Sequence, residues 1–250
     1  MIENNSDSLK QYEEWHINYN ANIVKLDELK LMTWHKTVLD ILLKNDISQK
    51  KFLEVGCGNG DFSNYLSLHY NTDIIGVDFS EQSIKVANTK KEFFKTHTAA
   101  FQTSDAQNLP FEDNRFDFVV SCECLEHVPS PQKMIDELYR VVKKGGTVIL
   151  TTENYSNAYA YYIAFLRLRN RKYDSGSSAQ PIENFFVFWN VIKKFRLAGF
   201  EKIKTSSKQY VLLLIPGMSP DTFTIMETKS KFFKFILKPF GRRFTYIATK

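Results

Sequence analysis

The chain has 250 residues, of which 43% are hydrophobic and 24% charged. This composition supports one sizeable α/β core and argues against a disordered or a membrane-spanning chain. The net charge of +5 is concentrated in one segment, because six basic and no acidic residues lie between 228 and 243, while elsewhere 27 basic residues face 28 acidic ones. A general nucleic-acid-binding surface is therefore not indicated.

The polar N-terminal residues and the three cysteines predict a cytoplasmic protein with reduced thiols. The first ten residues contain no apolar stretch of the kind found in secretion signals, and the longest apolar run, Val211–Ile215, is too short to span a bilayer. An odd number of cysteines argues against a disulfide framework. Cys122 and Cys124 have no second cysteine pair or histidine cluster to complete a metal site, so we expect no metal.

Strands and helices are predicted to alternate from residue 51 to residue 152, after an amphipathic helix over 28–45. Ser80 is a candidate N-cap, and a turn is expected at 144–146. This alternation is typical of βαβ units, which build a mostly parallel, doubly wound sheet with helices on both faces. The predicted strands are 51–55, 73–77, 101–103, 116–121 and 147–152, and the predicted helices are 61–69, 81–93 and 131–142.

The alternation loosens after residue 152. An antiparallel hairpin is expected to close the edge of an α/β sheet of seven strands, with an aromatic helical cap beside it. The elements predicted here are a helix over 155–169, a loop over 173–181, a helix over 183–197 that ends at Gly199, a strand over 200–206 and a strand over 244–249.

The strongest motif is a glycine loop between a predicted strand and a predicted helix. Glycines 56, 58 and 60 stand where the chain must turn sharply and let a ligand approach its backbone. A nicotinamide-binding loop would have the pattern G-x-G-x-x-G, but Asp61 occupies the place of its last glycine. An acid beside a pyrophosphate would be repulsive. Glu54, just before the first glycine, is a second departure, and an acid there suits a cationic ligand such as one that carries an ammonium and a sulfonium group.

Two further acidic residues follow predicted strands. Asp78 comes 18 residues after Gly60, a spacing at which a carboxylate accepts hydrogen bonds from both ribose hydroxyls, although it could also simply begin the next helix. Phe79 would then lie against an adenine ring. Asp105 could accept the adenine amino group while the backbone of Ala106 meets a ring nitrogen; the alternative for Asp105 is an ordinary turn residue.

These segments together resemble the class I S-adenosylmethionine-dependent methyltransferases, and most closely the small-molecule branch that includes ubiquinone- and menaquinone-biosynthesis enzymes. The motifs FLEVGCGNGDFS, IIGVDFSEQSIKVAN, TSDAQNLPFEDNRFDFVVSCECLEHV and ELYRVVKKGGTVILTTEN occur in the family's order. The resemblance implies a Rossmann-like fold, S-adenosylmethionine as cofactor, S-adenosylhomocysteine as product, and no metal. The residues it assigns to the cofactor are Glu54, Gly56, Cys57, Gly58, Gly60, Asp78, Phe79, Asp105, Ala106, Ser121 and Cys122.

Methyl transfer from a sulfonium needs alignment and exclusion of water more than activation of the leaving group. A hydroxyl acceptor additionally needs a base, and His127 is the candidate because it follows a strand at the edge where ligands bind in such sheets. An unperturbed imidazole titrates near pH 6.5, which suits this role. Alternatively, His127 packs at the start of the next helix, Glu123 or Glu126 pairs with it or shapes the pocket, or the acceptor is an amine that needs no strong base.

The chain is expected to consist of a core and three segments around the acceptor. The predicted units are an N-terminal helical cap (1–47), the S-adenosylmethionine-binding core (48–153), a cap insertion (154–182) and a C-terminal part of the sheet (183–250) with a basic aromatic insertion (211–243).

The stretch 229–243 has three interpretations. Phe232, Phe233, Ile236, Leu237 and Phe240 fall on one helical face among lysines. The stretch could be a lid on the core, a peripheral contact with an anionic membrane that delivers a lipid-like acceptor, or the binding site of an anionic acceptor such as a nucleotide-linked sugar.

We expect a methyltransferase that acts on a small molecule. The favoured target is a hydroxyl group of a lipid-like or sugar-linked acceptor. The alternatives are an N-methyltransferase for a small molecule or for nucleic acid, and a non-catalytic cofactor-binding scaffold. The residues from Ser121 to Cys124 lack the Pro-Pro motif of many enzymes that methylate base amines, which argues against nucleic acid. Membrane association and oligomeric state are left open by the sequence.

Overall fold

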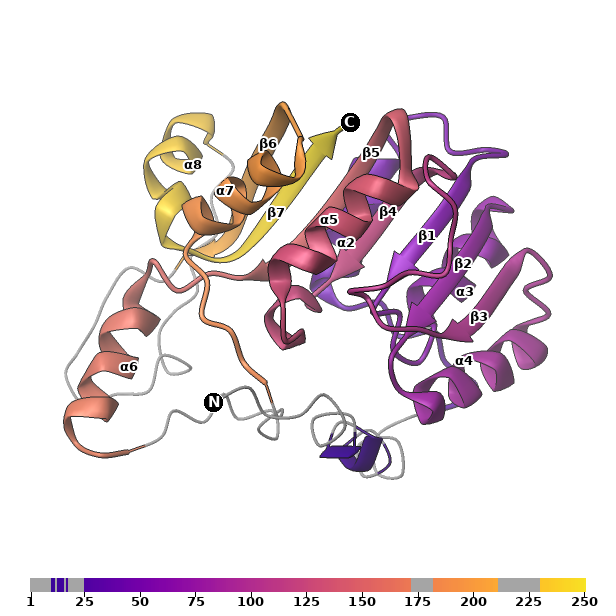
Figure 1. Ribbon diagram of the computed structural model, residues 1–250, viewed down its shortest axis with the longest axis horizontal. Helices are drawn as coiled ribbons and strands as arrows, with labels where there is room; N and C mark the ends of the chain where they lie inside the picture. Colours follow the sequence, from indigo (N-terminus) through magenta and orange to yellow (C-terminus); the bar gives the residue numbers. More distant parts are fainter. Residues whose placement is uncertain (1–9, 12, 16, 18–24, 172–181, 211–229) are drawn as a thin grey trace.

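The structure is a computed structural model that describes residues 10–11, 13–15, 17, 25–171, 182–210 and 230–250. Seven strands form one sheet in the order β3-β2-β1-β4-β5-β7-β6 (Figure 1). Strands β1 to β5 pair in parallel, and β7 runs antiparallel between β5 and β6, which confirms the predicted sheet and its antiparallel C-terminal edge. The strands are β1 (Lys51–Val55), β2 (Asp73–Asp78), β3 (Ala99–Thr103), β4 (Phe116–Cys122), β5 (Val142–Glu153), β6 (Lys202–Tyr210) and β7 (Gly241–Thr249).

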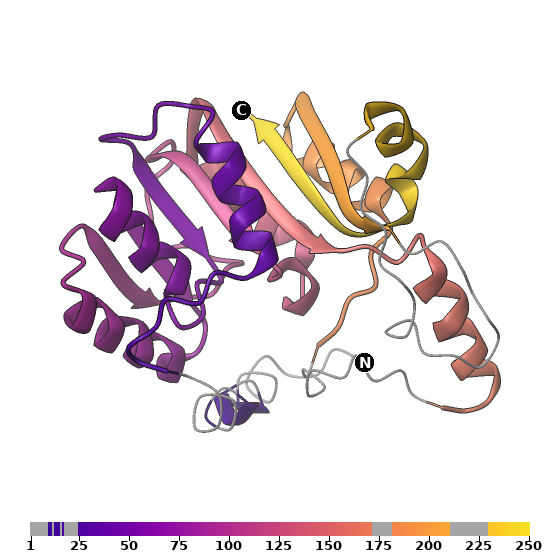
Figure 2. The same ribbon diagram turned by 180° about the vertical axis from the view of Figure 1, so that it is seen from behind.

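Helices cover both faces of the sheet. Figure 1 shows α5 and α7 in front of it, and Figure 2 shows α2 on the opposite face. A further helix, α6, stands beside the sheet. The described helices are α2 (Thr33–Leu42), α3 (Asp61–Tyr70), α4 (Glu81–Phe94), the 3-10 turn η1 (Leu125–His127), α5 (Pro131–Val141), α6 (Ala158–Leu168), α7 (Phe188–Ala198), α8 (Lys231–Leu237) and the 3-10 turn η3 (Lys238–Phe240).

The central strands bury both of their faces, so the molecule has two apolar clusters. Successive side chains of a strand point to opposite faces. In β1, Phe52 therefore packs with the α2 and α3 side chains Leu42 and Leu66, while Leu53 packs with Leu138 of α5 and its neighbours. The continuous apolar run of a parallel strand is thus divided between two layers.

Most core elements begin and end within two residues of their predicted bounds. Ser80 caps α4 by accepting a hydrogen bond from the Ser83 amide at 3.1 Å, and Gly199 ends α7 with a φ of 109°, both as predicted. The expected loop at 173–181 lies outside the described residues, and so does residue range 211–229 of the predicted insertion.

Several predicted bounds were wrong. The first helix starts only at Thr33, because Met32 is extended, and it ends at Leu42. The helix expected from residue 183 begins at Phe188, since the preceding residues 182–187 run without regular structure over the sheet edge. The expected turn at 144–146 lies inside β5 as a bulge: Phe116 pairs with Val142, but Phe118 pairs with Thr147.

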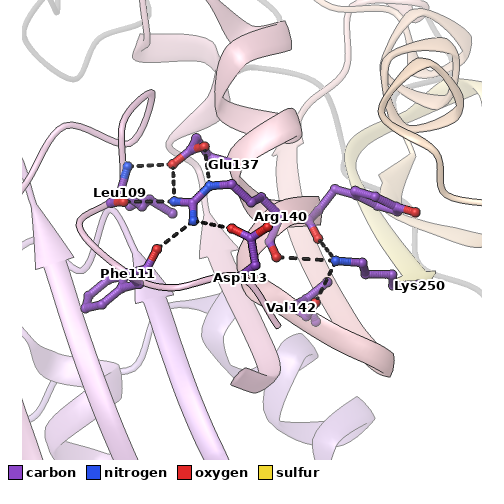
Figure 3. Close-up of polar contacts among 8 residues, drawn as sticks. Leu109, Phe111, Asp113, Glu137, Arg140, Val142 and Lys250 are labelled. Atoms are coloured by element: carbon purple, nitrogen blue, oxygen red, sulfur yellow. Dashed lines mark hydrogen bonds and ion pairs between the residues drawn. The ribbon is translucent and has the colours of Figure 1, made fainter. Parts of the chain in front are cut away.

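Arg140 of α5 ties the connection between β3 and β4 to the rest of the core (Figure 3). Its guanidinium donates to the carbonyls of Leu109 (2.9 Å) and Phe111 (2.6 Å) and to the carboxylates of Asp113 (2.9 Å) and Glu137 (2.7 Å). Glu137 in turn accepts from the Leu109 amide at 2.7 Å. One charged side chain therefore holds a segment that has little regular structure of its own.

Replacing Arg140 tests this role. We expect Arg140→Ala to lower the free energy of unfolding by about 2–4 kcal/mol, because two carbonyls and a half-buried carboxylate lose a charged donor. Urea unfolding measures the effect. The matched control is Lys133→Ala on the exposed face of the same helix, expected to change stability by less than about 0.5 kcal/mol. Equal costs for the two variants would contradict the role of Arg140.

Candidate functional site

The glycine loop joins β1 to α3 and is held against the end of β2. The amides of Gly56 and Cys57 donate to the carbonyl of Val77 at 2.8 and 3.0 Å. Gly56, Gly58 and Gly60 have φ values of 75°, 50° and 70°, a region that favours glycine. A Cβ at Gly56 would collide with Cys124, but a Cβ at Gly58 would meet nothing within 4 Å. The backbone at Gly58 is therefore open to a ligand.

Asp78, at the end of β2, contacts this open part of the loop. Its Oδ2 accepts a hydrogen bond from the Gly58 amide at 2.8 Å, and its Oδ1 accepts from the Ser80 amide at 3.0 Å. The carboxylate thus orients both the loop and the start of α4, and it remains partly exposed. Phe79 is half-buried beside it. The carboxylate that sequence spacing assigns to a ribose lies beside the glycine loop.

Asp105 follows β3 and forms a local turn. Its Oδ1 accepts from the backbone amide of Gln107 at 2.8 Å and from that residue's side-chain amide at 3.1 Å. Gln107 then accepts from the amide of Ser130, just before α5, at 2.8 Å. Ala106 packs against the apolar cluster beneath α5. The turn role of Asp105 is therefore visible in the geometry, and its adenine role stays a prediction.

Glu54 belongs to β1, and its carboxyl is buried against α3. It is 1% exposed and accepts a hydrogen bond from the Ser63 hydroxyl of α3 at 2.5 Å. Burial raises the pKa of its carboxyl to about 8, against the lowering effect of this hydrogen bond. The proposed contact of Glu54 with a cationic ligand stays a prediction, and the sequence had not indicated Ser63 as its partner.

The three cysteines lie near the loop as thiols. Cys57 and Cys122 are buried, and burial raises the pKa of both well above the ordinary value. Ser121 is also fully buried, and its hydroxyl has no hydrogen-bond partner among the described residues. Within those residues no three His, Cys, Asp or Glu side chains gather as a metal ion would require.

His127 ends the 3-10 turn η1 that follows β4, and a carbonyl orients its ring. Nδ1 lies 2.9 Å from the carbonyl oxygen of Ile182. Because a carbonyl only accepts hydrogen bonds, Nδ1 must carry the proton, and in the neutral ring Nε2 then holds the lone pair. This is the tautomer in which Nε2 can accept a proton.

Asn184 makes three hydrogen bonds to the backbone in and after η1. Its backbone amide donates to the carbonyl of Glu126 at 2.7 Å, and its side-chain amide donates to the carbonyls of Glu126 (3.1 Å) and Val128 (2.9 Å). Ile182 and Asn184 belong to the strap of residues 182–187 that crosses this edge. Sequence reasoning missed both residues, because no local pattern indicates a contact across more than 50 positions.

Buried carboxyl groups surround the ends of β4 and β5. Burial, helped by the nearby Glu123, raises the pKa of Glu126 well above its usual range, and Glu126 accepts from the Thr152 hydroxyl at 2.8 Å. Burial also raises the pKa of Glu123, although the Arg243 guanidinium opposes this and donates to its Oε2 at 2.9 Å. Glu123 Oε1 has no hydrogen-bond partner in the described part of the chain. The sequence had counted Arg243 only as part of a basic segment.

The comparisons with known proteins indicate a family. A family model described as a methyltransferase domain matches residues 53–150. The chain is 32% identical over 200 residues to the demethylmenaquinone methyltransferase of Staphylococcus saprophyticus, covering 74% of this chain and 83% of that protein. It is 38% identical over 115 residues to a ubiquinone biosynthesis O-methyltransferase of Coxiella burnetii, covering 46% of this chain and 48% of that protein.

A solved structure supports the same fold. The crystal structure of an S-adenosylmethionine-dependent methyltransferase of Thermotoga maritima, described as a possible histamine N-methyltransferase, superposes with a TM-score of 0.63. The superposition covers 98% of this chain and 99% of that one at 18% identity, so the likeness concerns the fold alone. The sequence relationship carries the classification further. The chain belongs to the class I S-adenosylmethionine-dependent methyltransferases, in the branch that acts on small molecules.

Proposed function

We propose that this enzyme methylates a hydroxyl group of a lipid-like small molecule, with His127 as the base. The observation that carries the cofactor assignment is the contact between the Gly58 amide and Asp78 at 2.8 Å, beside a backbone that is open to a ligand. The named relatives that act in menaquinone and ubiquinone biosynthesis support a quinone-like acceptor.

The residues at the sheet edge fit S-adenosylmethionine. The Asp78 carboxylate offers acceptors to a ribose, and Asp105 offers acceptors to an adenine amino group. The buried Ser121 hydroxyl, at the end of β4, lies on the same edge. When bound, the cofactor supplies a methyl group that a positively charged sulfur already activates. The protein then has to align the acceptor and exclude water.

The proposed base depends on the strap. The Ile182 carbonyl keeps the proton on Nδ1 of His127, so that Nε2 would accept the proton of the acceptor hydroxyl. Asn184 fixes the carbonyls of Glu126 and Val128, the two residues that flank His127 in the sequence. The carboxyls of Glu123 and Glu126 belong to the segment that follows β4 and includes η1, at the same edge, and the proposed acceptor would lie beside them.

Asp78→Asn tests the cofactor site. We expect S-adenosylhomocysteine affinity, measured by calorimetry, to fall about tenfold or more, because the amide replaces a charged acceptor of ribose hydrogen bonds. The matched control is Asp73→Asn at the exposed beginning of the same strand, which should bind normally. Thermal unfolding of both variants checks the fold. Normal affinity in Asp78→Asn would refute the ribose assignment.

His127→Gln tests the base. We expect turnover with a hydroxyl acceptor to fall about 100-fold or more, since general-base catalysis contributes 10²–10⁴-fold, while cofactor affinity changes little. Unchanged turnover, or an equal loss of cofactor affinity, would mean that His127 is structural.

We also propose that a basic aromatic surface contacts an anionic membrane. This surface consists of Phe232, Phe233, Lys234, Phe235, Ile236 and Phe240 on α8 and η3. Its four phenylalanines and Ile236 are 42–80% exposed, Phe235 the most. No helix within the described residues is long and apolar enough to cross a bilayer, so the contact would be peripheral.

The surface is anchored next to the proposed acceptor site. The side chains of Asn154 and Ser156, which follow β5, donate to the carbonyl of Pro239 at 3.1 and 2.7 Å. A membrane contact at this position would bring a lipid-like acceptor close to the sheet edge. The positive charge of the segment favours anionic lipid, since each basic residue near such a surface contributes about 1 kcal/mol.

Vesicle co-sedimentation tests this contact. The double variant Phe232→Ser/Phe235→Ser should bind phosphatidylglycerol-containing vesicles about tenfold more weakly than the wild type, because two exposed aromatic rings no longer enter the interface. Leu197→Ser, which alters a 68% exposed side chain on α7, is the matched control and should bind as the wild type does. Equal binding of the double variant, or equal wild-type binding to neutral vesicles, would contradict the proposal.

A further inference from the structure

Glu123 has an unusual backbone conformation at the point where the chain leaves β4. Its φ is 49°, in the left-handed region that residues other than glycine rarely adopt. A residue keeps such a conformation only when its surroundings hold it there, and residues of this kind gather at functional sites. Glu123 lies between Cys122, the last residue of β4, and η1, which contains His127. The direction of residues 123–127, the β4–η1 segment, is therefore set at Glu123.

Two contacts hold Glu123 in this conformation. Its backbone amide donates to the carbonyl of Thr151 in β5 at 3.0 Å. Its carboxylate accepts a hydrogen bond at 2.9 Å from the guanidinium of Arg243, near the beginning of β7. The Glu123 and Arg243 side chains are 12% and 20% exposed, so water and salt screen their attraction little. The contact between these two side chains is the one that a substitution can remove.

Arg243 is itself fixed by three neighbouring elements. Its guanidinium lies 4.4 Å from the centre of the Trp34 ring of α2 and donates to the Gln209 side chain of β6 at 3.1 Å. It also lies 3.6 Å from the carboxylate of Glu153 in β5. An arginine can make these contacts together, because its planar group combines five N–H donors with a face that stacks on aromatic rings. The position of the Glu123 carboxylate is thus tied to the sheet and to α2.

The β4–η1 segment packs against the glycine loop. A Cβ on Gly56 would lie 2.6 Å from the Cβ and the Sγ of Cys124, so the loop approaches Cys124 as closely as a glycine allows. The carbonyl of Cys124 in turn accepts a hydrogen bond from the His127 amide at 2.9 Å. A change of direction at Glu123 would therefore press Cys124 against the loop that carries the Gly58 amide, or withdraw it.

We propose that Arg243 is a positioning residue of the methyltransferase site, which acts through Glu123 on the fit between the β4–η1 segment and the glycine loop. The inference rests on the cofactor site proposed above, because the glycine loop is the element whose position it controls. It assigns a role in cofactor affinity to a side chain of the last strand. If Arg243 only stabilised the sheet, its loss would lower the melting temperature and leave cofactor affinity unchanged.

Calorimetric titration with S-adenosylhomocysteine tests this role. We expect Arg243→Gln to weaken binding about fivefold, because a group that supports a binding loop contributes less than a direct ligand does. Arg243→Lys keeps the positive charge and should retain more of the affinity than Arg243→Gln. The matched control is Arg242→Gln, which removes the same charge from the neighbouring residue, whose Nε lies 3.3 Å from Glu153. This control should bind as the wild type does.

The double variant Glu123→Gln/Arg243→Gln decides whether Arg243 acts through Glu123. If it does, the double variant should bind about as weakly as the weaker of the two single variants, since both remove one contact. Thermal unfolding of every variant separates stability from affinity. Normal affinity in Arg243→Gln, or the same loss from Arg243→Gln with and without Glu123→Gln, would overturn the proposal. An absence of wild-type binding would refute the cofactor site itself, and the proposal with it.

Discussion

The position of β1 between β2 and β4 is the constraint on which the rest of this site depends. The chain leaves β1 in one direction to build β2 and β3, and then crosses back to place β4 on the other side. The loops after β1 and β4 therefore diverge, and in parallel sheets a ligand site forms where they part. The amides of Gly56 and Cys57 attach the glycine loop to the end of β2, which brings the Gly58 amide to Asp78.

The antiparallel strand contributes to the same edge for a simple geometric reason. Because β7 runs opposite to β5, the first residues of β7 lie beside the last residues of β5. Arg243 thereby reaches Glu123 and Glu153, and η3 is attached to the residues that follow β5. The carboxyl groups that burial would otherwise destabilise gain a cationic neighbour, and the basic C-terminal segment lies next to the proposed acceptor site.

The core elements were predictable because their signals are local. The glycine loop, the apolar strands, the Ser80 cap and the Gly199 helix end depend on residues that are close in sequence, and the structure confirms these elements. The helix expected from residue 183 was wrong because apolar residues at helical spacing cannot reveal a competing tertiary contact. Asn184 instead bonds to the carbonyls of Glu126 and Val128, which keeps the strap out of the helix.

The sequence by itself determined the cofactor class and the succession of strands and helices along the core, since glycine spacing, strand periodicity and the acids after each strand are read within short windows. Only the tertiary structure decided what surrounds the acceptor. The Ile182 carbonyl that orients His127 is 55 residues away, and Arg243 is 120 residues from Glu123. Such contacts arise where distant segments of the chain meet at one edge of the sheet, and no local pattern of side chains identifies these partners.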